Sequence, residues 1–174
     1  MLAYALEAGR EDIITLLYLG RYAALRIHEC FRIDTATASR AIREQAITIK
    51  GKGGLVRTVP LHPILIPRLQ YHLERTPRGK KLFVPDGVET HQAIKELQAF
   101  IYIHRPYAQD PDSTRPMTFH GLRHLCVTEW YFQRIDAGAS PYEARKECAR
   151  LLGHGRDDVT TIYLASAKGD ARHD

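Results

Sequence analysis

Apolar residues follow a helical period through most of this 174-residue chain, and the period changes in one place. Residues 46–60, AITIKGKGGLVRTVP, alternate apolar and polar positions on both sides of a glycine-rich turn. This alternation predicts a β-hairpin with strands at 46–50 and 55–60. The expected fold class is therefore mainly α with a small antiparallel β-sheet (α+β).

Helical spacing and capping signals predict the remaining elements. Ser140 and Glu143 form a capping box with Pro141 at the first helical position, and Gly153 can cap the end of the same helix. Residues 81–85, KLFVP, suggest a short extra strand, and the proline- and aspartate-rich residues 105–116 suggest a loop. The predicted helices cover residues 11–24, 23–31, 35–45, 63–75, 90–103, 119–137 and 141–152.

The amino-acid composition is typical of a folded globular protein. Hydrophobic residues make up 44% of the chain, which supports a core and argues against a disordered protein. There is no run of about 18 apolar residues, and the first residues lack a signal peptide, so we expect a cytoplasmic protein. Cys30, Cys126 and Cys148 form no close pair and are expected to be reduced. By length, residues 1–174 are expected to form a single domain.

Two pairs of polar residues suggest anion binding. His120 and Arg123 point to one face at the start of a predicted helix, where free backbone N–H groups attract anions. Glu29 follows Arg26 by three residues. The two either form a local ion pair, or the carboxylate orients a buried arginine toward an oxyanion. Since each pair also suits an ordinary surface role, the residues alone leave both readings open.

Three further residues stand in or beside turns. Lys52 is the only ionisable residue in the GKGG turn. It is either a solvated lysine or a cation that the turn brings to a ligand. The longer phosphate-loop pattern is absent, which disfavours a nucleotide site. His154 follows the helix that ends at LLG, and Tyr163 comes nine residues later within a predicted short helix. Either one could instead cap a helix or pack in the core.

The order of these residues resembles the catalytic signature of the tyrosine recombinase (phage integrase) family. The matching stretches are ALRIHE, TIKGKGGLVRTVPL, TFHGLRHLCVT and LLGHGRDDVTTIYL, and the resemblance extends from about residue 10 to residue 165. It implies the tyrosine recombinase/integrase catalytic-domain fold of DNA breaking-rejoining enzymes. It also implies a site-specific recombinase or integrase that cleaves and rejoins duplex DNA through a 3′-phosphotyrosyl intermediate. That chemistry needs no metal, ATP or other cofactor.

The resemblance assigns the proton transfers to three residues. Tyr163 would be the nucleophile, but a free tyrosine has a pKa of about 10 and needs a base or a strongly positive site. His120 would assist its deprotonation, and Lys52 would protonate the leaving 5′-hydroxyl.

The remaining assigned residues would hold the scissile phosphate. Arg26, Arg123 and His154 would bind its oxygens, because guanidinium groups present paired donors to phosphate. Such donors also stabilise the charge of the transition state. Glu29 would support Arg26.

The resemblance also sets the expected partners. Double-stranded DNA would be the substrate, and the net charge of +5 permits such a polyanion. The full-length protein would form a homo-oligomer, a tetramer, on DNA, and this chain alone would be a monomer. Family members carry an additional N-terminal core-binding domain, which we expect to be absent from this chain. The gene would belong to a bacterium, a phage or another mobile element, and no membrane partner is expected.

Three other functions compete with this one. A type IB topoisomerase-like enzyme would share the chemistry, but the residues of the HGLRH and LLGH motifs favour an integrase. A non-catalytic DNA-binding regulatory module is disfavoured, since the set of catalytic residues is complete. A metal-dependent nuclease is the weakest alternative, because neither clustered carboxylates nor His/Cys ligand spacing occurs.

Overall fold

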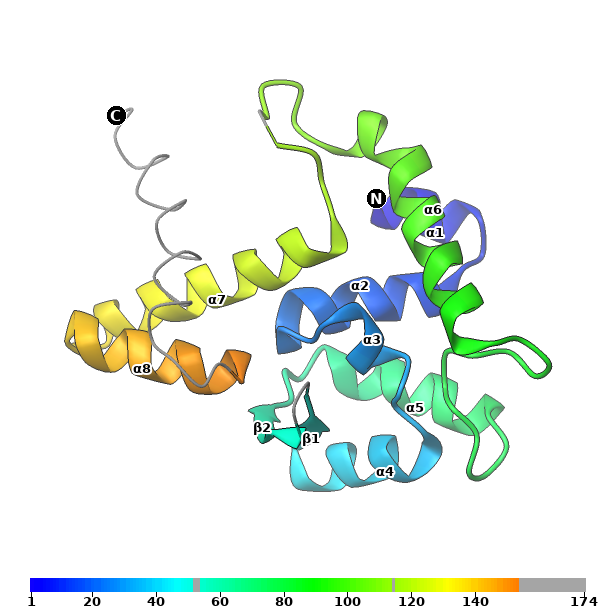
Figure 1. Ribbon diagram of the computed structural model, residues 1–174, viewed down its shortest axis with the longest axis horizontal. Helices are drawn as coiled ribbons and strands as arrows, with labels where there is room; N and C mark the ends of the chain where they lie inside the picture. The colour runs from blue at the N-terminus through cyan, green and yellow to red at the C-terminus, as the bar shows by residue number, and fades with distance from the viewer. Residues whose placement is uncertain (52–53, 114, 154–174) are drawn as a thin grey trace.

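The computed structural model describes residues 1–51, 54–113 and 115–153 (Figure 1). Within these ranges the chain forms eight helices and one two-stranded antiparallel sheet, which confirms the expected fold class. The elements are α1 (Leu2–Glu7), α2 (Glu11–Ala23), α3 (Ile27–Cys30), α4 (Thr35–Glu44), β1 (Ala46–Lys50), β2 (Val56–Pro60), α5 (Leu65–Arg75), α6 (Thr90–Ala108), α7 (Phe119–Asp136) and α8 (Pro141–Leu152).

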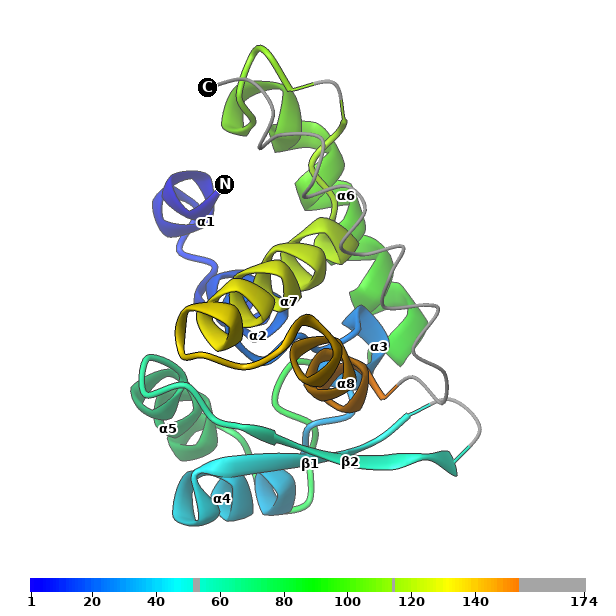
Figure 2. The same cartoon turned by 90° about the vertical axis from the view of Figure 1, so that its left-hand side faces the viewer.

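Helix α2 is the central element of the fold. It packs against α1, α3, α5 and α7, and α8 lies along α7 (Figure 1). The hairpin passes between α4, which packs on β1, and α8, which contacts β2 (Figure 2). Gly20 allows α7 to approach α2 closely, because a Cβ there would lie 3.0 Å from Cζ of Phe119. The hairpin is thus held between two helices far apart in the sequence.

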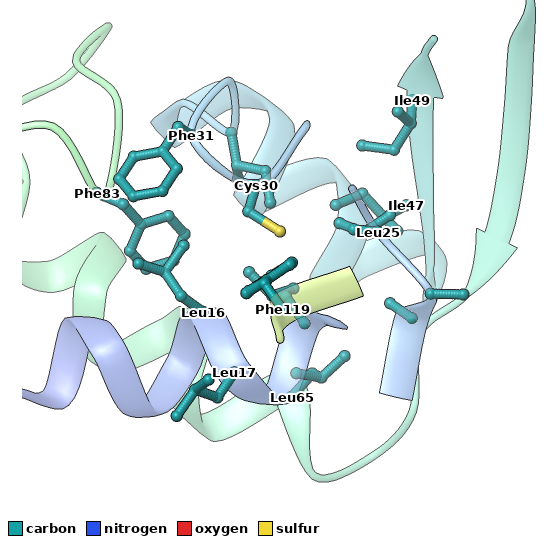
Figure 3. Packing of buried hydrophobic residues seen from close by; sticks show 14 of the residues in the cluster. Leu16, Leu17, Leu25, Cys30, Phe31, Ile47, Ile49, Leu65, Phe83 and Phe119 are labelled. Carbon is teal, nitrogen blue, oxygen red and sulfur yellow. The ribbon is translucent and has the colours of Figure 1, made fainter. Parts of the chain in front are cut away.

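The buried face of the hairpin joins the main hydrophobic core. In the register of the sheet, Ile47 lies opposite Val59 and Ile49 lies opposite Arg57, and all four side chains are buried. Figure 3 shows Ile47 beside Leu25, in the same cluster as residues of α2. An arginine therefore occupies one inward position of a strand whose other inward position is apolar.

The capping predictions for α8 are confirmed, and α4 has a side-chain cap as well. The Asp34 carboxylate accepts a hydrogen bond from the N–H of Thr37 at 2.7 Å and begins α4. Ser140 and Glu143 form the predicted capping box of α8, and Gly153 ends that helix with φ of 64°. These signals act within a few residues, which is why sequence spacing reveals them.

Three predicted boundaries are wrong. Residues 81–85 form no strand, because Lys81 makes only an isolated bridge with Asp34 and no neighbouring strand extends the pairing. Helix α6 has Glu89 as its N-cap and continues through Pro106 to Ala108, where a loop was expected. Pro106 lies in the last turn of α6, and beyond it the N–H of Gln109 still donates to the carbonyl of Arg105 at 3.1 Å.

The third boundary concerns the segment that carries Arg26. A continuous helix was expected over residues 23–31, but only Ile27–Cys30 is helical. Ala24 adopts φ of 49°, in the left-handed region, and ends α2 there. The chain therefore turns sharply between α2 and α3, and Arg26 lies in the turn.

Cys30, Cys126 and Cys148 form no disulfide, as expected. Across the part of the chain that the structure describes, no helix is both long and apolar enough to cross a membrane. The same part holds no group of three metal-ligating side chains.

Candidate active site

Glu29 is the centre of a cluster of arginines. Its side chain is fully buried, and Arg57 donates to both carboxylate oxygens at 2.8 and 2.7 Å. Arg26 donates through its backbone N–H at 2.7 Å and through Nη1 at 3.1 Å. Nη1 of Arg123 lies 3.9 Å from the same carboxylate. One carboxylate thus gathers three guanidinium groups from three separate segments.

The local structure of α3 explains how Arg26 is placed. Arg26 was expected to lie within a helix, but it is the N-cap of α3 and its backbone is extended (φ −73°, ψ 151°). The Glu29 carboxylate reaches back to the N-cap N–H in the manner of a capping box. The Arg26 side chain is held by Glu29 on one side and remains one-quarter exposed to solvent.

Arg57 belongs to this cluster, although the sequence analysis did not single it out. Its side chain is only 5% exposed, and Nε donates to the carbonyl of Leu151 at 2.9 Å. Strand alternation contained a signal for it, since Val59 faces inward and residue 57 must then face inward too. A charged residue at an inward position needs a buried partner, and Glu29 is that partner.

Arg123 lies in the second turn of α7 and is fully buried. Its Nη1 donates to the carbonyl of Ala24, and its Nη2 donates to the carbonyl of Leu152 at 2.7 Å. Thr118 caps the helix by accepting from the N–H of Gly121 at 3.0 Å. The guanidinium therefore joins the turn after α2 to the end of α8.

His120 lies one turn before Arg123 on the same face of α7, as predicted. Its exposed ring stands edge-on to that of His124, with centroids 4.8 Å apart. Partial desolvation, followed by the positive charges of Arg123 and Arg26, lowers the pKa of His120 below its usual value. At neutral pH the ring is therefore a neutral group that can accept a proton.

A cavity of about 390 Å³ opens between α3, α6 and the start of α7. Arg26, His28, Arg105 and His120 line it together with apolar residues. Arg26 and His120 therefore share an open space that a phosphate could enter.

The cluster has an excess of positive charge. Burial alone would raise the pKa of Glu29, but the hydrogen bonds from Arg57 and from the N–H of Arg26 lower it to about 2. Glu29 is thus ionised at neutral pH and balances only one of the three arginines around it. The remaining positive charge suits an anionic ligand such as phosphate.

Lys52, His154 and Tyr163 lie outside the described residues. The described neighbours of Lys52 and His154, which are Gly51 and Gly153, border the cluster. A Cβ on Gly51 would lie 3.6 Å from Oε1 of Glu29, and one on Gly153 would lie 2.9 Å from Cδ of Arg57. The hairpin end and the α8 end thus meet at Glu29 and Arg57.

Known proteins share sequence and fold with this chain. No family model matches the chain. The tyrosine recombinase XerC of Chlamydia caviae is 27% identical over 150 residues, which are 85% of this chain and 45% of that protein. The chain therefore spans less than half the length of this curated relative.

Solved structures share the fold at low identity. The XerA recombinase superposes with a TM-score of 0.66 at 17% identity, over 99% of this chain and 62% of that one. The Tn1549 transposon integrase in complex with circular intermediate DNA gives 0.61 at 16% identity, over 95% and 59%. The XerH site-specific recombinase bound to a palindromic difH substrate gives 0.59 at 22% identity, over 91% and 45%. The chain is therefore similar in sequence to a tyrosine recombinase and has the fold that the recombinase and integrase structures share.

Proposed function

We propose that this chain is the catalytic domain of a site-specific recombinase or integrase that cleaves and rejoins duplex DNA through a 3′-phosphotyrosyl intermediate. The observation that carries the proposal is the cluster of Arg26, Arg57 and Arg123 around the buried Glu29. The cluster carries surplus positive charge near His120, near the end of β1 that leads to Lys52, and near the end of α8 that leads to His154. Residues predicted to act together thus come from, or adjoin, segments that meet in space.

The reaction requires one bond exchange at phosphorus. The Tyr163 oxygen attacks the scissile phosphate, a P–O bond to the tyrosine forms, and the P–O bond to the 5′-oxygen breaks. His120 takes up the phenolic proton, and Lys52 supplies a proton to the leaving 5′-oxygen. Rejoining is the reverse, so the energy of the broken bond is kept in the covalent adduct.

Arg26, Arg123 and His154 hold the phosphate in this proposal. Arg26 is open to the cavity and is ready to bind. Arg123 is fully buried and engaged with two carbonyls, so a phosphate reaches it only after a local rearrangement at the end of α8. His120, with its lowered pKa, is neutral and suited to accept a proton.

The proposed substrate is double-stranded DNA. XerH and the Tn1549 integrase share the fold and were solved with DNA, and the net charge of +5 favours phosphate contacts. Residues 1–174 act as a single domain that is monomeric alone, and the full-length protein acts as a tetramer on DNA. A protein that recombines bacterial, phage or mobile-element DNA works in the cytoplasm, where that DNA lies.

The decisive experiment traps the covalent intermediate. The protein is incubated with a library of nicked suicide duplexes whose sequence is randomised around the nick, so that the target site need not be known. An adduct that survives denaturation and maps to Tyr163 by mass spectrometry supports the proposal. An adduct at another residue, or cleavage that strictly requires magnesium, contradicts it.

The same trap, together with an assay of supercoiled-plasmid relaxation, separates the alternatives. A type IB topoisomerase-like enzyme forms the same adduct but relaxes supercoiled plasmid of any sequence. A non-catalytic module binds duplex DNA and forms no adduct. The relatives and structures described above are recombinases and integrases, which favours recombination.

A further inference from the structure

We propose that Arg57 is a positioning residue of this active site, which orients Glu29 and Arg26 and joins the hairpin to the end of α8. The inference rests on the proposed function and extends it to a residue outside the predicted catalytic set. Arg57 lies in β2, between the hairpin turn that carries Lys52 and the rest of the domain.

The donors of Arg57 are directed at protein groups. Nη1 and Nη2 each donate to one oxygen of Glu29, at 2.8 and 2.7 Å, in a planar two-bond pairing. Nε donates to the carbonyl of Leu151 at 2.9 Å. With the side chain 5% exposed, the guanidinium acts on a DNA phosphate only through the groups it holds.

Each of these contacts adjoins a residue of the predicted site. Glu29 holds Arg26 through two hydrogen bonds, so the orientation of the carboxylate sets that of Arg26. Leu151 lies near the end of α8, and Gly153 at its C-cap would place a Cβ 2.9 Å from Cδ of Arg57. Gly51, on the other side, would place a Cβ 3.6 Å from Nη1. One side chain therefore contacts or borders the three segments that lead to Arg26, Lys52 and His154.

Packing alone does not account for an arginine at this position. The other inward residues of the hairpin are Ile47, Ile49 and Val59, and an aliphatic side chain would continue that face. Burying an arginine and a glutamate carries a desolvation cost that apolar residues avoid. What an apolar residue cannot provide is the fixed three-way geometry among a carboxylate, a helix end and a strand. Small errors in such geometry slow a reaction steeply.

The test compares Arg57→Lys with a matched control, Arg10→Lys. Arg10 also makes a two-bond pairing with a carboxylate, that of Asp12 at 2.8 and 2.7 Å, but on the α1–α2 side of the molecule. Adduct formation is measured in single turnover at saturating protein, with DNA affinity and thermal unfolding measured separately. We expect Arg57→Lys to slow adduct formation about 10²-fold with unchanged DNA affinity, and Arg10→Lys to leave the rate unchanged.

A double-mutant cycle with Glu29→Gln tests whether Arg57 acts through Glu29. If it does, the double variant is no slower than the slower single variant; if Arg57 contacts phosphate itself, the losses multiply. Multiplied losses, or an Arg57→Lys rate equal to that of Arg10→Lys, overturn the inference while the wild-type adduct upholds the proposed function. A wild-type protein that forms no adduct contradicts the proposed function itself, and the positioning role falls with it.

A second variant covers the case in which Arg57→Lys does not fold. Glu29→Gln combined with Arg57→Met removes the buried carboxylate together with the arginine that pairs with both of its oxygens. Arg123 keeps its hydrogen bonds to the carbonyls of Ala24 and Leu152. We expect this variant to fold and to be strongly slowed in adduct formation. A wild-type rate would overturn the positioning role.

Discussion

Arg123 donates through Nη2 to the carbonyl oxygen of Leu152 at 2.7 Å, and this bond joins the second turn of α7 to the last residue of α8. The other terminal nitrogen of the same guanidinium donates to the carbonyl of Ala24. Arg123 is therefore both a predicted phosphate ligand and a buried support for two backbone segments. A change at this residue should affect stability and catalysis together.

Arg123→Lys should lower both the free energy of unfolding and the rate of adduct formation. An ammonium group cannot reproduce the planar set of donors, and a buried carbonyl left without its partner costs about 1–3 kcal/mol. Loss of one transition-state donor lowers a rate by about 10²–10³. Denaturant unfolding and single-turnover cleavage measure the two effects.

Arg134→Lys is the control for that prediction. Arg134 links the same two helices through Glu147 at 2.6 Å but is 40% exposed, so its loss should cost well under 1 kcal/mol and leave cleavage unchanged. Cleavage by Arg123→Lys at the rate of Arg134→Lys would exclude Arg123 from the reaction.

Tyr163→Phe should abolish adduct formation while DNA affinity is retained. Only the phenolic oxygen is removed, and the ring is kept. Tyr107→Phe provides the control, since Tyr107 is 75% exposed on α6 and should form adduct normally. A persistent adduct in Tyr163→Phe would assign the nucleophile to another residue.

Lys52→Ala should slow cleavage of ordinary DNA strongly and cleavage of a 5′-bridging phosphorothiolate substrate only slightly. A thiolate leaves without a proton donor, so only the ordinary substrate needs the acid. Lys50→Ala, a change of the exposed lysine at the end of β1, should affect the two substrates equally. Equal slowing of both substrates by Lys52→Ala would mean that Lys52 binds DNA and does not supply the proton.

Acid should unfold the wild-type protein through Glu29. Its pKa is about 2 in the folded protein and near 4.5 when unfolded, so its stabilising contribution is complete above about pH 4.5 and is lost as the pH falls toward 2. The difference corresponds to roughly 3 kcal/mol, at about 1.4 kcal/mol per pKa unit.

Urea unfolding at a series of pH values measures this effect. Glu29→Gln should be less stable than the wild type at neutral pH and should lose less stability between pH 4.5 and 2. Parallel pH curves for the two proteins would show that Glu29 is not the group that titrates.

Sequence reasoning succeeded where the determining interactions are local. The hairpin follows from strand alternation, and the start of α8 follows from Ser140 and Glu143, three residues apart. It failed at residues 81–85, because β-propensity produces a strand only where a partner strand is available. It also misplaced Arg26, since the left-handed turn at Ala24 that ends α2 depends on how α2 and α3 pack.

Local patterns in the sequence are enough to predict the fold class and the two strands of the hairpin, and the ordered set of polar residues resembles that of tyrosine recombinases. The residue that links this set, Arg57, is apparent only from packing between distant segments. Arg57 and Glu29 are separated by 28 positions, and their pairing exists because α3 and β2 bury the two charges against each other. Local spacing cannot reveal such a pair, because the requirement for a partner arises only when packing removes both groups from water.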